Sequence, residues 1–419
     1  MRNLLHVAAG VALLALLAAQ YAGADDGQFL DGRLIALEAG DHMSRYAPVV
    51  LPYHGPAPEK KVNVVEDKTG KRFPVTIRDD EFVFVPEGAM PGTKHMYLVE
   101  THDPSAPMVV QIDKVEGADQ LEVRIRDEHL TTYHYSNENK KPFLWPVYAE
   151  GGVTITRDWP MGDQELSDDH KHHKSLWSSY GNVNGADCWG EGDNSGYQVS
   201  GDVQWGSGDA YGWIAAKNTW QNNNREPVVS EEREYRFYAS PAKARILDLI
   251  LTFTASYGDV LFKDTKEGGI MTARVRDIIT EEQGGTITNA AGGVGAGQCW
   301  GKPAAWCDYS GSIGDAGLRG IAIFDHPTNL RHPTTWHVRD YGLMGANCFG
   351  YSHFTKSKEN GDYTLKDGES VTFRYRVYIH TGGVDLAKVA DRYADYAAPP
   401  EAAWVQPAEG SAASGAGGE

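Results

Sequence analysis

The sequence predicts an all-β protein, in which a small β-sandwich precedes a large antiparallel two-sheet supersandwich. First, the 419 residues include 47 Gly, 21 Tyr and 11 Trp, a composition typical of β-structure with binding loops. Second, short β-branched and aromatic runs recur between Pro, Gly and Asp turns. Third, only residues 385–396 have a convincing helical spacing, through Leu386, Val389, Ala390 and Tyr393.

The beginning of the chain has the pattern of a secretory signal peptide over residues 1–24. Arg2 precedes an apolar run over residues 7–19, and Ala22-Gly23-Ala24 forms a small-residue cleavage site. The run is shorter than the roughly 20 residues that cross a bilayer, and no later run is apolar enough. We therefore expect an exported protein, periplasmic or extracellular, without a membrane span in the mature chain.

Residues 25–112 are expected to form the small N-terminal sandwich. The runs 62–65, 82–85 and 95–99 read as strands, because each lies beside a Pro, Gly or Asp turn. Pro104 and Pro107 mark a joint. This part carries no catalytic cluster, so a structural or accessory role is the preferred interpretation.

Residues 113–398 are expected to form the large unit that carries the site. Clear strand patterns occur at 121–125, 246–253, 320–324 and 371–379. So many strands over roughly 285 residues exceed one simple sandwich and favour a two-sheet supersandwich. Residues 399–419 are expected to be a flexible tail, since they end in a Gly-, Ala- and Ser-rich sequence.

The net charge of −18 disfavours nucleic acid and anionic membranes as partners. It also argues mildly against highly sulfated or uronic sugars, unless a local basic pocket compensates. The sequence contains no GxSxG elbow, HExxH helix, phosphate-binding P-loop or strand-linked dinucleotide motif. No cofactor is therefore certain, and a divalent metal is the one possibility left open.

Residues 168–189 hold the densest group of reactive side chains, with His170, His172 and His173 beside two aspartates. Clustered imidazoles and carboxylates either transfer protons or bind a metal. Alternatively, they serve only to form hydrogen bonds with backbone groups of a loop. Trp177 and the tryptophan at 189 suit the packing of sugar rings. If this part were a strand, His170 and His172 would share one face and His173 would point away.

A second group follows the strand at 320–324. His337 and Arg339 alternate along the chain, so they are expected to face the same cavity, which the block at 168–189 would share. The expected catalytic residues are His170, His172, His337 and Glu267, and three of these, His170, His172 and His337, are the possible metal ligands. The expected substrate-binding residues are Lys141, Arg157, Trp177, Asn184, Asp187, His326, Asn329, Arg339 and Asn347.

Several of these motifs resemble one known family. They are KPFLWP at 141–146, the block DHKHHKSLW with GNVNGADCW, DTKEG at 264–268, and FDHPTN with HPTTWHVRDYGLMGANCFG. Together they resemble the PmoA-like family of domains of unknown function, over residues 113–398. The resemblance implies an exported bacterial protein with a galactose-mutarotase-like supersandwich.

This chain departs from the family pattern at two cysteines. Cys188 and Cys348 stand in motif loops where the family has other residues. From this departure we predict that the loops touch through a disulfide between Cys188 and Cys348, and that Cys299 and Cys307 form a second bond.

Three functions stay open at this point. The first is an exported carbohydrate-active enzyme, of lyase, epimerase or hydrolase type, that uses histidine and carboxylate acid–base chemistry. The second is a glycan-binding protein that uses the same side chains without turnover. The third is an enzyme with a histidine-bound metal. The expected partner is a carbohydrate in each of the first two.

Overall fold

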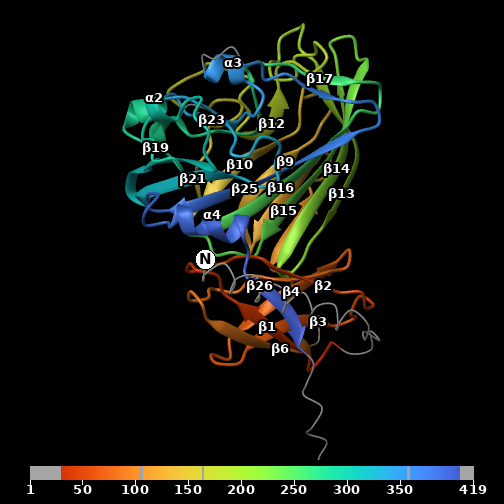
Figure 1. Cartoon of the computed structure of the whole chain (residues 1–419), viewed down its shortest axis with the longest axis vertical. Helices are drawn as coiled ribbons and strands as arrows, with labels where there is room; N and C mark the ends of the chain where they lie inside the picture. Colours follow the sequence, from red (N-terminus) through yellow and green to blue (C-terminus); the bar gives the residue numbers. More distant parts are fainter. Residues whose placement is uncertain (1–29, 103–106, 163–164, 356–358, 406–419) are drawn as a thin grey trace, which may run out of the picture.

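In the computed structural model, antiparallel strands build two units that lie one above the other in Figure 1. The structure describes residues 30–102, 107–162, 165–355 and 359–405. The expected signal peptide over residues 1–24 lies outside them. None of the helices in these ranges is long and apolar enough to cross a membrane. The prediction of an all-β protein with a large two-sheet sandwich is confirmed.

The small unit is a single antiparallel sheet folded around its own core. Its strands are β1 (Leu34–Glu38), β2 (Val49–Pro52), β3 (Lys61–Glu66), β4 (Arg72–Arg78), β5 (Glu81–Phe84), β6 (Lys94–His102) and β26 (Glu401–Val405). They pair in the order β2-β5-β4-β3-β6-β1-β26. The two outer strands meet, because the indole of Trp404 donates to the carbonyl of Pro52 at 2.9 Å and its ring lies 4.9 Å from that of Phe82.

Two expected boundaries need correction. The tail expected from residue 399 begins with β26, which returns to the small unit and pairs with β1. Ala402 and Trp404 alternate along β26 and pack against the core of that unit, and this short pattern was hidden by the polar residues that follow. At the joint, β7 (Val110–Lys114) pairs within the large unit, so that unit begins before residue 113.

The first sheet of the large unit contains β7 and eight further strands. These are β8 (Gln120–Ile125), β9 (Glu128–His134), β10 (Phe143–Ala149), β11 (Val153–Thr154), β12 (Leu176–Tyr180), β18 (Gly268–Arg274), β22 (Trp336–Val338) and β23 (Leu343–Ala346). The order is β22-β23-β18-β12-β10-β9-β8-β7, with β11 beside β10.

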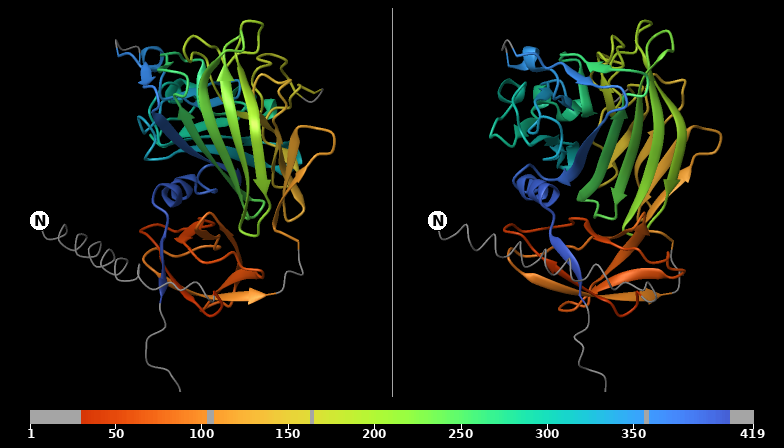
Figure 2. Two further views of the ribbon diagram at one scale, coloured as in Figure 1. Left: turned by 90° about the vertical axis from the view of Figure 1, so that its right-hand side faces the viewer. Right: turned by 45° about the vertical axis from the view of Figure 1, so that its right-hand side comes forward.

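The second sheet packs against the first. It consists of β13 (Tyr197–Gly206), β14 (Tyr211–Gln221), β15 (Pro227–Tyr238), β16 (Ala244–Thr254), β19 (Thr286–Asn289), β20 (Trp306–Ser312), β21 (Leu318–Asp325) and β25 (Ser370–Thr381). The order is β13-β14-β15-β16-β25-β21-β20-β19, and Figure 2 shows its long strands as one layer. Leu176 and Met344 of the first sheet share a core with Leu249 and Val377 of the second.

Helices are few and short. The 3₁₀ turns are η1 (Asp277–Ile279), η2 (Glu281–Gln283) and η3 (Gly314–Ala316). The α-helices are α2 (Ala296–Cys299), α3 (Tyr351–Phe354) and α4 (Val389–Ala397). A separate two-stranded sheet is formed by β17 (Val260–Phe262) and β24 (Tyr363–Leu365). The helix expected from residue 385 therefore begins only at Val389.

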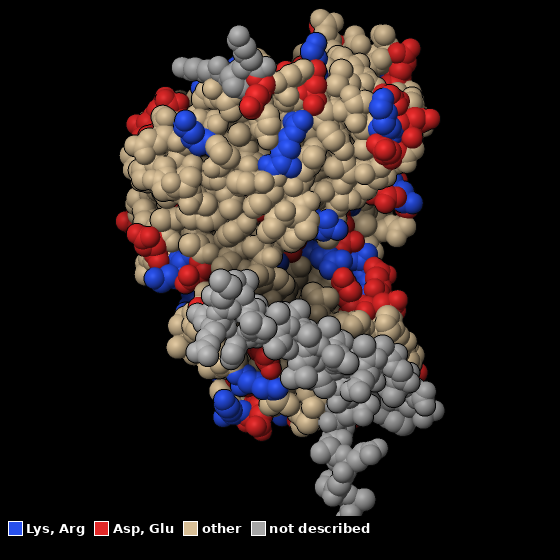
Figure 3. Space-filling model, in the orientation of Figure 1, with Lys and Arg blue, Asp and Glu red and all other residues tan. Residues whose placement is uncertain are grey.

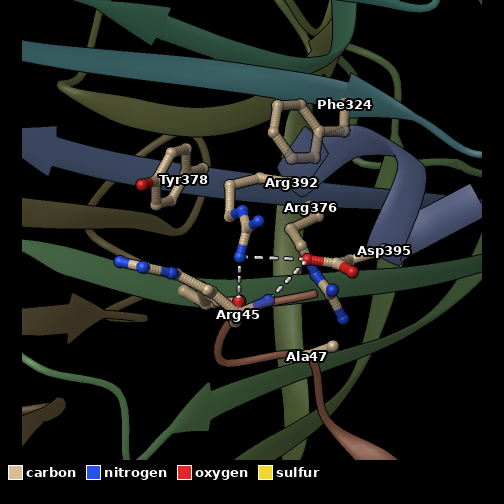
Figure 4. A pocket seen from close by; sticks show the side chains of 8 residues that line it. Arg45, Ala47, Phe324, Arg376, Tyr378, Arg392 and Asp395 are labelled. Atoms are coloured by element: carbon tan, nitrogen blue, oxygen red, sulfur yellow. Dashed lines mark hydrogen bonds and ion pairs between the residues drawn. The ribbon is translucent and has the colours of Figure 1, made fainter. Parts of the chain in front are cut away.

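Helix α4 ties the two units together. Arg392 donates to the carbonyls of Met43 and Arg45 at 2.7 and 2.5 Å, and Asp395 accepts from the Arg45 backbone at 3.2 Å, as Figure 4 shows in part. The side chains around these contacts leave no space that a water-sized molecule could enter. The region around Arg392 and Asp395 is therefore a packed contact between the two units rather than a ligand site.

Ion pairs add to the same joint. Arg78 and Glu81 of the small unit pair with Glu234 and Arg236 of β15, at 3.1 and 2.7 Å. In Figure 3, acidic and basic side chains lie next to one another where the units meet.

Candidate functional site

The candidate site lies on the face of the first sheet that points away from the sheet–sheet core. Successive side chains of a strand point to opposite faces, so each strand here contributes to both. The side chains in the core are Leu144, Leu176, Val338 and Met344, and their strand neighbours Phe143, Trp177 and Leu343 form a separate outer cluster. His337 lies between Trp336 and Val338, which are both in the core, so it also points outward.

Loops cover this outer face and bury much of it. Residues 168–175 are not a strand, so the alternation of side chains that a strand would give does not apply to the three histidines. His170 has a left-handed backbone with φ of 43°, and the backbone N–H of His173 donates to the His170 carbonyl at 2.8 Å. This turn stacks the rings of His170 and His173, with centroids 4.8 Å apart.

Trp189 connects the two parts of the sequence that carry histidines. Its ring centroid lies 6.1 Å from that of His172, 5.4 Å from that of His173 and 6.2 Å from that of His337. Asp187 holds the tryptophan loop by accepting from the backbone N–H groups of residues 189 and 190, both at 2.9 Å. The two sequence blocks therefore meet, in a group that we call the histidine cluster and that consists of His170, His172, His173, Trp189, His337 and Tyr341.

Asp169 and His170 form a supported pair at the exposed side of this cluster. Nδ1 of His170 lies 2.5 Å from Asp169 Oδ2. The other carboxylate oxygen accepts from Arg157 at 2.9 Å and from Arg274 at 3.2 Å, and both arginines are buried. Burial alone would raise the pKa of Asp169, but Arg274, His170 and Arg157 together lower it. Asp169 is therefore ionised near neutral pH and accepts a hydrogen bond from Nδ1–H of His170.

His172 and His337 are neutral near neutral pH. Burial, followed by the charges of Lys141 and His170, lowers the pKa of His172 to about 4. Burial, followed by the charges of Arg339 and Lys266, lowers the pKa of His337 to about 3. Neutral imidazoles offer both a donor and an acceptor to hydroxyl groups.

Two buried lysines lie beneath the cluster and share Glu191. Their ammonium groups are each 3.3 Å from a different carboxylate oxygen of Glu191. Lys141 also donates to the carbonyl of Trp189 at 2.5 Å, and Lys174 lies 3.5 Å above the ring of Trp159. Burial lowers the pKa of Lys174 to about 8. Lys141, expected to bind substrate, thus holds the loop that carries Trp189.

Glu267 lies at the edge of the cluster and is half-exposed. Its carboxylate pairs with Lys266, and its charge acts on Tyr341. Asn347 holds this segment, because its amide donates to the Thr265 and Lys266 carbonyls at 3.0 and 3.3 Å while its oxygen accepts from the backbone of residues 349 and 350. Asn347 is fully buried and so positions its neighbours instead of facing a substrate.

Four other expected site residues are used in structural contacts. Asn184 is bonded to the backbone of Asp259 and Leu261, beside β17. His326 bonds Thr328, and Asn329 bonds Asp325 and the Arg374 backbone, so both serve the end of β21. The ring of Trp177 is fully buried and supports His173 from below, at 5.4 Å.

Four residues in or around the cluster were not assigned to the site from the sequence: Arg274, Tyr341, Lys174 and Glu191. Tyr341 stacks on His170 with centroids 5.0 Å apart and has Arg274 4.8 Å above its ring. Arg274 could have been found, because it ends a strand whose preceding residues are almost all small or apolar. For Tyr341 and Glu191, which lie in loops, the sequence offers no comparable signal.

The structure does not bring the expected metal ligands together around one point. Across the described ranges, no three His, Cys, Asp or Glu side chains converge as a metal site would require. His170 faces Asp169, and the rings of His172 and His337 each lie against that of Trp189.

The structure contains neither of the two predicted disulfides. All four cysteines are free and buried. The thiol of Cys188 points to the carbonyls of Tyr197 and Gln221, at 3.9 and 3.8 Å. Cys348 lies instead among Asp325 and Arg331, whose charges act on it. The loops share the large core, but these two thiols face different neighbours.

No curated protein sequence matches this chain. Among solved structures, an α-galactosidase from Lactobacillus brevis is similar over 67% of this chain and 41% of its own, with 9% identity and a TM-score of 0.34. This chain thus spans less than half of that enzyme. A galactose 1-epimerase from Lactobacillus acidophilus NCFM is similar over 66% of this chain and 100% of its own, with 7% identity and a TM-score of 0.32.

A family model matches residues 120–394, which is more than half of the chain and includes every residue of the histidine cluster. The protein belongs to the family of unknown function DUF6807.

Proposed function

We propose that this protein is an exported carbohydrate-active enzyme that transfers a proton on a sugar, with His170 as the acid–base group. The observation that carries the proposal is the Asp169–His170 pair, whose carboxylate is held by two buried arginines. Export rests on the pattern of residues 1–24.

The pair has the arrangement that proton transfer needs. Since Asp169 is ionised, Nδ1 of His170 keeps its proton and donates a hydrogen bond to the carboxylate, and Nε2 is left to exchange a proton with a substrate. Arg157 also donates to the His170 carbonyl at 3.1 Å, which fixes the turn that presents the ring. A positioned base of this kind serves an epimerase, a lyase or a hydrolase alike.

The surroundings suit a sugar ring. Trp145 and Trp159 flank the cluster and Tyr341 belongs to it, and all three are half-buried, so their exposed ring edges remain available for C–H groups. The neutral His172 and the amphipathic tyrosine can bond hydroxyl groups beside them.

The test is a screen of the purified mature protein against neutral and acidic oligosaccharides, with product analysis by mass spectrometry and NMR. Replacing His170 by Asn should abolish turnover and leave the melting temperature unchanged. Lys171→Ala is the matched control, because Lys171 is the exposed residue next to His170 and its side chain is not part of the Asp169–His170 pair. Binding without product would favour the glycan-binding alternative, and stoichiometric metal in elemental analysis would favour a metal enzyme.

A further inference from the structure

The part of the site around Arg339 has hydrogen-bond donors without acceptors. The guanidinium group of Arg339 is half-exposed and has no carboxylate or carbonyl partner in the described part of the chain, and it lies 5.2 Å from the ring centroid of Trp300. By contrast, Arg157 and Arg274, at the other side of the cluster, are each paired with the carboxylate of Asp169, although the Nε of each is buried without a partner in the described residues. An arginine without a partner beside a proposed sugar site can take an anion.

Indole groups add to this surplus of donors. Trp145, Trp189 and Trp300 are the tryptophans whose N–H is buried without an acceptor in the described residues, and all three lie in or beside the site. The buried indoles of Trp220 and Trp336, which lie elsewhere, bond a carboxylate and a carbonyl. Because an indole N–H can only donate, a ligand that satisfies these groups must bring acceptor oxygens.

His337 connects the indoles of Trp189 and Trp300 to Arg339. Its ring contacts Trp189 on one side and Phe354 on the other, at 6.2 and 6.1 Å, and Phe354 packs on Trp300 at 5.3 Å. Nδ1 of His337 is buried without a partner. A neutral imidazole has one donor and one acceptor nitrogen, so this unpartnered Nδ1 can bond a hydroxyl group.

We infer that the sugar taken by this site carries a carboxylate, with Arg339 binding that carboxylate and His337 accepting from an adjacent hydroxyl. This inference rests on the proposed function and adds the substrate class, uronates or their oligosaccharides. A planar carboxylate matches the two parallel N–H groups of a guanidinium, which neither a hydroxyl nor an ester does.

The acidic surface does not oppose this assignment. Exposed charges more than about 8–10 Å away are largely screened at physiological salt. The charge of −18 belongs to the whole chain, whereas Arg339 acts within the cluster, on both His337 and Tyr341. Lys266 does not serve as a second anchor, because Glu267 pairs with it.

The experiment compares matched ligands by calorimetry: methyl glucuronide and methyl galacturonide, their methyl esters, the corresponding neutral methyl hexosides, and a 6-sulfated hexose, with the oligomers of each sugar where monomers bind weakly. The uronates should bind most tightly. Arg339→Gln should weaken uronate binding about 10- to 100-fold, the range expected for a charged hydrogen-bonded pair, and leave ester and hexoside binding unchanged.

Variants keep the test interpretable. Arg339→Lys should recover part of the affinity, and Trp300→Phe should weaken uronate binding by removing an N–H while keeping a ring. Arg374→Gln changes an exposed arginine of β25 in the other sheet and should have no effect. Melting temperatures identify any variant that fails to fold, and Arg339→Lys then replaces Arg339→Gln as the deciding variant.

Two results would overturn the inference and leave the proposed function standing. One is turnover of neutral hexosides that depends on His170 and ignores Arg339, and the other is a sulfated sugar bound as tightly as the uronates. Failure of every sugar to bind or react would overturn both.

Discussion

The indole of Trp189 lies against the imidazole of His337, with ring centroids 6.2 Å apart and an interplanar angle of 30°. Trp189 is in a loop that follows β12, and His337 is in β22, at the edge of the same sheet. Their contact brings together two blocks that are far apart in the sequence. The site therefore has a His170 side, where the supported carboxylate lies, and an Arg339 side, where a guanidinium group has no carboxylate partner in the described residues.

Asp169→Asn should lower kcat/KM about 100-fold or more, because an amide no longer fixes the tautomer of His170. Asp168→Asn is a closely matched control, since Asp168 is the exposed preceding residue and makes no contact with the two arginines. Steady-state kinetics on the substrate found in the screen would measure both. Equal losses in the two variants would contradict a specific role for Asp169.

The stability of the protein should fall as the pH decreases below about 6.5. Because the pKa of His337 is lowered to about 3 in the folded state, the unfolded chain binds more protons between these values, and acid favours unfolding. Urea titrations at pH 7.5, 6.0, 5.0 and 4.5 would measure this. His337→Gln should make the dependence less steep, whereas a change at the exposed His353 should not. An unchanged slope in His337→Gln would contradict the burial of a neutral imidazole.

The four thiols should react with a thiol reagent only after unfolding. Burial raises the pKa of Cys188 to about 12 and that of Cys299 to about 11, so little thiolate is present and access is closed. Titration with an aromatic disulfide reagent should find almost no reactive thiol in native protein and four in guanidinium chloride. Fewer than four in denaturant without reductant would show that disulfides form after all.

Glu191→Gln should destabilise the protein by about 3 kcal/mol at pH 7, because two buried ammonium groups lose their shared counter-charge. The loss should shrink at pH 9.5, since the pKa of Lys174 is lowered to about 8 and its charge is then removed. Glu232→Gln, which breaks an exposed pair with Lys217, should cost less than about 1 kcal/mol. Similar losses in the two variants would contradict the buried arrangement.

Local pattern was enough to predict the fold class and many strands. The alternation at 121–125 and the apolar run at 246–253 became β8 and β16, because strand formation there depends on which residues can be buried on each face. Neighbouring residues carried no comparable information about β26. Its five residues form a strand only because β1 offers a free edge, far away in the sequence.

The sequence by itself determined that histidines, aspartates and tryptophans gather at 168–189 and that His337 and Arg339 alternate beyond a buried strand. Only the tertiary structure decided that the two groups meet, that Arg274 and Tyr341 join them, and that Asn184 and His326 do not. Residue type and spacing fix which face of a strand a side chain takes. Which strands become neighbours, and how loops such as 168–175 fold back over them, depends on contacts between distant segments, and those contacts are made only when the sheets close around their core.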